Sequence, residues 1–287
     1  MILLALLLAL GAERLMSTRR DGGSVDSPLV RLWQLLPKPL RDAPFATWLL
    51  AFALAGLVAL IGSSLSGGLT QLAYATAALF VCLGPRDLAD DVQRLRAARA
   101  SGDAATVARL TRSLQRGPAP DADHRSLLGA LFIQSHERRF GACLWFIVGG
   151  PAGAVLYRIA SRLSALVETP SAQRSAALLH NLLAWLPARL TALLFGLAGS
   201  MDDALDALKR VQREAPTAGS DGWQPRTWSL LAEAANASLD WEDAPGSGPM
   251  IASSLDATLA EVLRMETRAT LILLALVALF TAGVWVA

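Results

Sequence analysis

The sequence predicts an all-α integral membrane protein with five to six transmembrane helices, a cytoplasmic helical hairpin and a helical loop region. Of its 287 residues, 53% are hydrophobic and only 17% are charged, whereas charged residues make up about a quarter of a typical soluble domain. The mean hydropathy is +0.41. Several stretches approach the roughly 20 apolar residues that a bilayer-crossing helix requires. These observations indicate that lipid surrounds much of the chain.

The composition argues against several classes of function. The net charge of +2 is too small to indicate a nucleic-acid partner. Cys82 and Cys143 lie in apolar runs without CxxC spacing, so we expect buried thiols rather than a disulfide or a metal site. The three histidines, His124, His136 and His180, have no sequence neighbours that indicate a Ser-His-Asp set. A nucleotide-binding GxxxxGK[ST] motif is absent from the sequence, and we expect no cofactor.

Six apolar stretches are the candidate spans: 1–16, 45–61, 69–83, 141–160, 178–199 and 269–287. The first resembles the apolar region of a signal peptide, but it lacks a basic start and a small-residue cleavage site, so we expect a retained helix. The uncharged segment 62–68 is expected to join the second and third spans as a hairpin. Pro151 lies inside the fourth stretch and predicts a kink or a break there.

Basic residues near the span ends predict the orientation in the membrane. Segments 13–44 and 84–140 carry six and ten basic residues, which places both in the cytoplasm and the turn 62–68 outside. Six full spans would then leave segment 157–177 outside, although it carries three arginines, and segment 200–268 in the cytoplasm. A re-entrant fourth stretch would exchange the sides of these last two segments, and the sequence leaves both topologies open.

The chain is expected to comprise four segments. They are N-terminal membrane helices with a hairpin (1–84), a cytoplasmic helical hairpin (85–127), a membrane core (128–200), and a helical loop region with a C-terminal transmembrane helix (201–287). The Arg-rich face of the cytoplasmic hairpin is either a solvated surface or a surface held to anionic lipid headgroups.

Ionisable residues at membrane depth are the candidates for a functional site, because charges there are rare and face protein or water. The candidate ligand-binding residues are Glu13, Arg14, Glu137, Arg158 and Arg189. Arg14 and Arg158 lie at predicted span ends, where a long side chain can simply reach the interface. Arg189 lies inside the fifth span and needs a partner such as Glu13 or Glu137.

A glycine-rich motif, Gly-Gly-Pro-Ala-Gly, occupies residues 149–153 inside the fourth apolar stretch. Small residues in a membrane helix allow a neighbouring helix to approach closely. We therefore expect this motif to serve helix packing rather than phosphate binding.

Two stretches resemble a known superfamily of membrane proteins. They are WFIVGGPAGAVLYRIASRLSAL at 145–166 and WLPARLTALLFGL at 185–197. The superfamily contains the cobalamin-biosynthesis protein CobD/CbiB and the β-lactamase-regulon protein AmpE. Residues 13–15 resemble the start of AmpE, and residues 99–109 resemble the helical hairpin of the family. The resemblance covers most of the chain.

The two branches of the superfamily differ in their acidic residues. The synthase branch carries Gly-Asp-Pro…His-Pro after its first helix, and residues 16–26 lack this motif. Positions that match its further polar motifs hold here Ile133, Gln134, Glu137, Ser161, Arg162, Leu163, Ser164, His180 and Asn181. Only one acid, Glu137, remains of a set that would hold a metal–nucleotide, so the AmpE branch is expected to be closer.

This resemblance implies a non-enzymatic sensor or modulator of β-lactamase induction and cell-wall recycling in the bacterial inner membrane. It would bind a small anionic or amphipathic ligand in a polar intramembrane cavity. Its expected partners are the lipid bilayer and components of the AmpD pathway, with no nucleic acid. Two alternatives remain open: an adenosylcobinamide-phosphate synthase that forms an amide on a corrinoid carboxylate, and a transporter or lipid-handling protein, which the break at Pro151 suggests.

Overall fold

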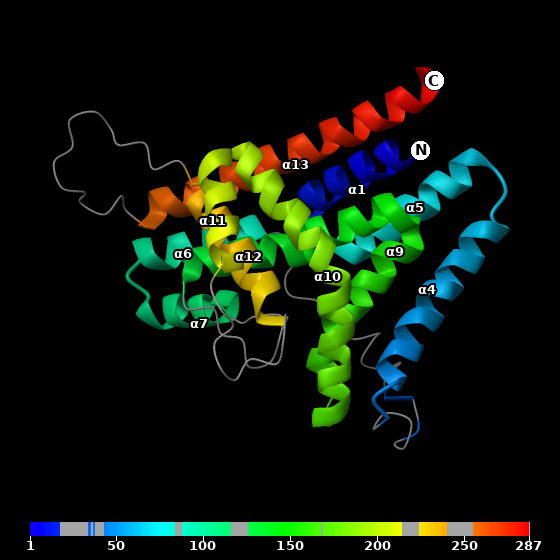
Figure 1. The fold of residues 1–287 in the computed structure, drawn as a ribbon, viewed down its shortest axis with the longest axis horizontal. Helices are drawn as coiled ribbons and strands as arrows, with labels where there is room; N and C mark the ends of the chain where they lie inside the picture. The colour runs from blue at the N-terminus through cyan, green and yellow to red at the C-terminus, as the bar shows by residue number, and fades with distance from the viewer. Residues whose placement is uncertain are drawn as a thin grey trace. The chain divides into compact units, whose positions relative to one another are not determined.

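The computed structural model describes most of the chain. The described residues are 1–17, 34–35, 37, 43–83, 88–115, 126–167, 169–213, 224–239 and 255–286. Every regular element in these ranges is a helix (Figure 1). The predicted all-α class is therefore confirmed.

Five helical runs in the described ranges are long and apolar enough to cross a membrane, by length and composition. They are Ala46–Ser64, Gly68–Ala100, Leu127–Leu163, Pro170–Ala198 and Leu255–Gly283, and the second of them passes over residues 84–87, which lie outside the described ranges. The first apolar stretch also forms a helix, α1 (Ile2–Ser17), but its 16 residues fall just short of the roughly 17 that a span requires. The chain is thus a multi-pass membrane protein.

The chain folds as two compact units, each described by itself. The first unit comprises Met1–Asp87, Pro118–Ala122 and His136–Pro187. The second comprises Leu88–Gly117, Asp123–Ser135 and Ala188–Ala287.

Helix α9 is the centre of the first unit. The helices of this unit are α1, α4 (Ala46–Ser64), α5 (Gly68–Leu83), the π-helix η1 (His136–Phe140), α9 (Gly141–Leu166) and the first part of α10 (Pro170–Ala198). A short turn joins α4 to α5, which confirms the predicted hairpin. The two helices diverge from that turn (Figure 1), because α4 packs mainly against α9 while α5 packs against α1 and α9.

Small residues let the helices of the first unit approach one another. Ala5 and Ala9 of α1, Ala51 of α4 and Ala154 of α9 are all buried. Lipid is as apolar as leucine, so membrane helices associate through close packing rather than through the hydrophobic effect. The large side chains Leu49, Phe52, Leu57 and Leu60 of α4 are exposed, as expected of a surface that faces lipid.

Helix α9 is broken in its middle, as the sequence predicts. Gly150 has φ 59° and ψ −151°, a conformation that favours glycine, and Pro151 has no backbone N–H to donate. A Cβ atom on Gly153 would overlap the carbonyl oxygen of Trp145, which lies before the break in the same helix, so this glycine lets the two halves of α9 pack against each other. A Cβ atom on Gly149 or Gly150 would meet no atom within 4 Å. The expected packing against a neighbouring helix is therefore wrong for Gly149 and Gly150, and at Gly153 the close contact is within α9.

The second unit contains the predicted helical hairpin. Its helices are α6 (Leu88–Ala100), α7 (Ala104–Gln115), α8 (Leu127–Ser135), α11 (Met201–Arg213), α12 (Gln224–Ala237) and α13 (Leu255–Val286), with the last part of α10. Gly102, with φ 72°, turns the chain between α6 and α7. The backbone N–H of Thr106 donates to Asp103 at 3.0 Å, and hydrogen bonds from Thr106 lower the pKa of the Asp103 carboxyl.

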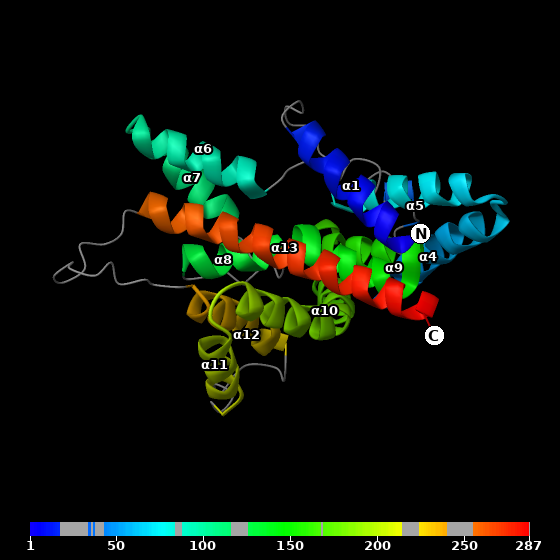
Figure 2. The ribbon, with the colours of Figure 1, turned by 90° about the horizontal axis from the view of Figure 1, so that it is seen from above.

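The starts of α11 and α13 show how the second unit is built. At the start of α11 the backbone N–H of Asp203 donates to the Ser200 hydroxyl at 3.5 Å, and that hydroxyl donates to the Asp203 carboxylate at 2.5 Å, so Ser200 caps the helix. Helix α13 begins at Leu255 and continues without interruption into the last apolar stretch, as Figure 2 shows. Residues 243–250, whose glycines and prolines indicate a loop, lie outside the described residues.

The packing of the second unit makes its side of the membrane testable. Within this unit α7 contacts α8, α8 contacts α12, and α12 contacts α11. We therefore expect Arg109→Cys in α7 and Asp206→Cys in α11 to lie on the same side of the membrane. A membrane-impermeant maleimide should label both cysteines only after the cells are opened.

The two native cysteines do not interfere with this measurement, because Cys82 and Cys143 are buried. Labelling of only one introduced cysteine in intact cells would show instead that α7 and α11 lie on opposite sides of the membrane.

Candidate functional site

Four polar side chains meet in the interior of the first unit. His136 and Glu137 come from η1, Tyr157 from α9 and His180 from α10. His136 and Tyr157 are 0% exposed, His180 is 2% exposed and the Glu137 side chain is 14% exposed. We call these four residues the Glu137 cluster. Its elements belong to helical runs of membrane-spanning length, so the cluster is a polar site within the membrane part of the protein.

A chain of hydrogen bonds connects the Glu137 cluster. The Tyr157 hydroxyl donates to Glu137 Oε1 at 2.6 Å, and His180 Nε2 lies 3.0 Å from the same oxygen. His136 Nε2 lies 3.1 Å from the Tyr157 oxygen. Because Tyr157 gives its only hydrogen to the carboxylate, His136 must donate to the hydroxyl through an Nε2–H, and His180 must do the same toward Glu137. The order of the chain is therefore His136, Tyr157, Glu137, His180.

Two local features of the sequence place these groups together. Consecutive residues of an α-helix point about 100° apart, yet His136 and Glu137 both reach Tyr157. They lie in the π-helical turn His136–Phe140, and such turns occur often at functional sites. Gly141 follows this turn, and a Cβ atom there would overlap the Tyr157 ring. The absence of a side chain at Gly141 thus makes room for the tyrosine.

Arg158 lies at the edge of the cluster. Its guanidinium NH1 is 3.5 Å from the backbone carbonyl oxygen of Glu137, and the side chain is half-buried. The consecutive residues Tyr157 and Arg158 therefore approach the same residue, one through its side chain and the other through its backbone. Of the predicted site residues, these contacts bring Glu137 and Arg158 together.

Glu13 has a different role from the one predicted for it. Its carboxylate pairs with Arg139 of η1 at 3.5 Å, and the two side chains are 5% and 15% exposed. The pair ties α1 to η1 inside the first unit. Breaking a buried ion pair leaves one charge without compensation in an apolar medium, so this contact constrains where α1 lies.

The other two predicted residues differ in exposure and belong to different units. Arg14 is exposed, on a different face of α1 from Glu13. Arg189 is half-buried and belongs to the second unit. The partners suggested for Arg189 are engaged elsewhere, since Glu13 pairs with Arg139 and Glu137 holds the cluster.

Sequence reasoning missed His136, Tyr157 and His180. The expectation that no histidine has a neighbour indicating a Ser-His-Asp set considered only neighbours along the chain. His180 lies 43 positions after Glu137, and only the fold brings their side chains together. Two signals were present, however. His136 directly precedes the one surviving acid, and Tyr157 directly precedes the candidate Arg158 in the glycine-rich motif.

The Glu137 cluster does not fit a metal–nucleotide. Within the described residues, no group of three or more His, Cys, Asp or Glu side chains could hold a metal ion. Glu137 is the only carboxylate of the cluster, and one of its oxygens accepts two hydrogen bonds. Hard cations such as Mg²⁺ prefer several oxygen ligands. The cluster is suited instead to hydrogen bonding and proton transfer.

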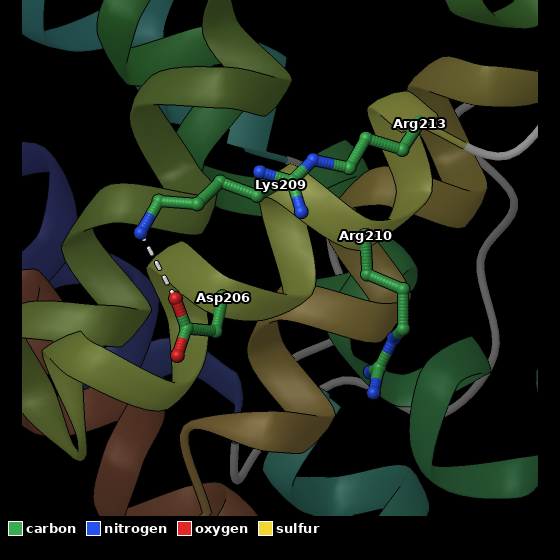
Figure 3. Close-up of a pocket in the computed structure, with 4 residues that line it drawn as sticks. All are labelled: Asp206, Lys209, Arg210 and Arg213. Carbon is green, nitrogen blue, oxygen red and sulfur yellow. Dashed lines mark hydrogen bonds and ion pairs between the residues drawn. The ribbon is translucent and has the colours of Figure 1, made fainter.

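A charged hollow on the second unit is not a comparable site. Asp206, Lys209, Arg210 and Arg213 of α11 line it, and Figure 3 shows Lys209 reaching Asp206 while Arg210 points away from both. The Lys209–Asp206 pair is 2.9 Å long, but its side chains are 61% and 76% exposed. Such exposed pairs contribute little, so this surface is the solvated end of an amphipathic helix.

The chain resembles known proteins over most of its length. The model of a family described as "CobD/Cbib protein" matches residues 23–240, which contain the whole Glu137 cluster. "Cobalamin biosynthesis protein CobD" of Chromobacterium violaceum is 31% identical over 182 residues, which cover 59% of this chain and 55% of that protein. The chain thus aligns with about half the length of this curated relative. No solved structure matches it.

The space left by Gly141 is predicted to be essential for the cluster. Gly141→Ala should displace Tyr157 and destabilise the protein by about 1–3 kcal/mol, the usual cost of overpacking a core. The thermal unfolding midpoint of the detergent-solubilised protein measures this. Gly149→Ala is the matched control in the same helix, because its new Cβ meets no atom within 4 Å. Equal midpoints for the two variants would contradict the role of Gly141.

The Glu13–Arg139 pair should behave as a buried ion pair. We expect Arg139→Met to destabilise the protein by about 3–5 kcal/mol, because it leaves the Glu13 charge buried without compensation. The double variant Glu13→Gln/Arg139→Met should recover most of that loss. Arg94→Met on the exposed face of α6 serves as the control, and thermal midpoints compare all four proteins. A double variant less stable than Arg139→Met alone would exclude the pairing.

Proposed function

The chain belongs to the CobD/CbiB family, and from this membership we propose that it is a membrane-embedded protein of cobalamin biosynthesis. The proposed reaction joins an amine to a corrinoid carboxyl group: the new C–N bond of the amide replaces the C–OH bond of the carboxyl group, and the hydroxyl leaves as water with the proton that the amine gives up. The observation that carries the proposal is the family match over residues 23–240, within which the Glu137 cluster is buried. The named relative from Chromobacterium violaceum supports the same pathway.

The Glu137 cluster offers one group that such a reaction needs. An amine that attacks an acyl group must lose a proton, and a carboxylate within hydrogen-bond reach can accept it. Glu137 is held for that role, because Tyr157 and His180 fix its position from two other helices. Arg158, at the edge of the cluster, carries a charge that would attract an anionic substrate. We assign no step to a metal or a nucleotide, because the described residues do not fit one.

We further propose the bacterial inner membrane as the location. The exposed arginines of α6 and α7 follow directly after a spanning helix, and the positive-inside rule assigns such a surface to the cytoplasm. Water-soluble corrinoid intermediates would reach the protein from that side.

A growth assay tests the proposed function. The full chain is expressed in a bacterium that lacks its own CobD protein and is grown without added cobalamin. We expect the wild-type chain to restore cobalamin production and Glu137→Gln to reduce it by at least about tenfold, as removal of a general base typically does. Glu261→Gln, on the outer part of α13, is the matched control and should match the wild type. Full cobalamin production by the Glu137→Gln variant would show that Glu137 is not the proton acceptor.

A second function is favoured by one observation within the site. The positions that the resemblance assigns to the synthase's other acids hold Ile133, Ser164, His180 and Asn181, and one oxygen of the surviving Glu137 already accepts two hydrogen bonds. Such a cluster could bind a small ligand without reaction, as an AmpE-like sensor of β-lactamase induction would. The same variants separate the two functions. If the chain fails to restore cobalamin but alters β-lactamase induction in a strain lacking AmpE, the sensor function replaces the synthase.

A further inference from the structure

An apolar cavity of about 310 Å³ lies in the first unit beside the break of α9. Phe146 and Gly149 of α9, Val58 of α4 and Leu72 of α5 contribute to its lining. Phe146 is buried, whereas Gly149 is exposed, so the lining extends from the interior of the unit to its surface. The cavity is separate from the residues that form the Glu137 cluster.

Each of the two polar side chains in the lining donates a hydrogen bond to the backbone. The Tyr74 hydroxyl donates to the carbonyl oxygen of Val58 at 2.6 Å. The Gln71 side-chain amide donates to the carbonyl oxygen of Leu65 at 3.0 Å. A polar solute would therefore find few free donors in the lining, and the cavity suits an apolar occupant.

The broken helix creates the room. Elsewhere on α9, Tyr157 occupies the space beside Gly141 and Trp145 occupies the space beside Gly153. The space beside Gly149 is open. The positive φ of Gly150 breaks the helix at this point, and the space beside Gly149 at the break stays unfilled. A void without an occupant forfeits dispersion contacts along its lining, so a ligand of matching chemistry would be stabilising there.

The surroundings identify the occupant. Helices α4, α5 and α9 belong to runs that are long and apolar enough to span the membrane, so the medium beside the cavity is hydrocarbon. Ser63, Ser64 and Ser66 lie in and beside the turn at the same end of α4 and α5, where the polar level of the bilayer begins. We propose that the cavity binds one acyl chain of a bilayer phospholipid, with the headgroup at the level of this serine turn.

Photolabelling of the reconstituted full chain tests the proposal. The protein is placed in nanodiscs that contain phosphatidylglycerol with a diazirine in one acyl chain, irradiated, digested and analysed by mass spectrometry. Labels on residues 146–152 should exceed those on the lipid-facing side of α4 by at least about threefold, because a held chain stays in contact longer than bulk lipid. A diazirine in the headgroup should instead label residues 63–71.

A filling substitution provides the decisive comparison. Gly149→Leu places a side chain in the cavity and should lower labelling of 146–152 at least threefold, by displacement of the bound chain. Gly56→Leu is the matched control, because a Cβ there also meets no atom within 4 Å but the residue faces outward on α4. Leu72→Ala enlarges the cavity from the other side and should raise the labelling, which keeps the test valid if Gly149→Leu fails to fold.

Two results would overturn the acyl-chain site. One is labelling of 146–152 no greater than that of the outer face of α4. The other is labelling that Leu72→Ala leaves unchanged and that a folded Gly149→Leu variant also retains. Photolabelling does not require the protein to be catalytically active. A negative labelling result would therefore contradict the acyl-chain site without contradicting the proposed function, which the growth assay tests separately. Glu137→Gln should leave the labelling pattern unchanged.

Discussion

The burial of the Glu137 carboxylate is the constraint on which the first unit depends. An ionised carboxylate in apolar surroundings is costly unless hydrogen bonds and an opposite charge compensate it. Tyr157 of α9 and His180 of α10 supply that compensation, so three elements must meet at one oxygen atom. The π-helical turn and the missing side chain of Gly141 are the local conditions that allow this meeting. The same turn carries Arg139, whose pair with Glu13 fixes α1.

Helix α9 serves two purposes because it is broken. The part that begins with Gly141 and the later part that carries Tyr157 pack closely and hold the Glu137 cluster. The middle, at Gly149 and Gly150, leaves an apolar cavity. Membrane proteins tolerate such breaks where protein or a cavity covers the freed backbone groups. One glycine-rich motif thus produces tight packing at one position and open space a few residues earlier.

Membership of the CobD/CbiB family bears on the pathway in which the protein acts, whereas the chemistry of the site bears on which reaction step it can carry out. The match over 23–240 supports cobalamin biosynthesis as the pathway. Within the described residues, the site keeps one carboxylate flanked by two imidazoles and a phenol, which suits proton transfer and not metal binding. A resemblance of fold and pathway therefore does not transfer every step of a reaction, since chemistry depends on the particular side chains present.

Composition and hydropathy alone determined the class of this protein, because long apolar helices are one of the few structures that satisfy every backbone hydrogen bond in lipid. Pro151 placed the break in α9, and the uncharged segment 62–68 placed the turn between α4 and α5. Local chemistry suffices for such features. Only the tertiary structure could place His180 beside Glu137, or pair Glu13 with Arg139 instead of Arg189. Those partners are far apart in the chain, and helix packing, which no short sequence pattern encodes, decides which charges meet.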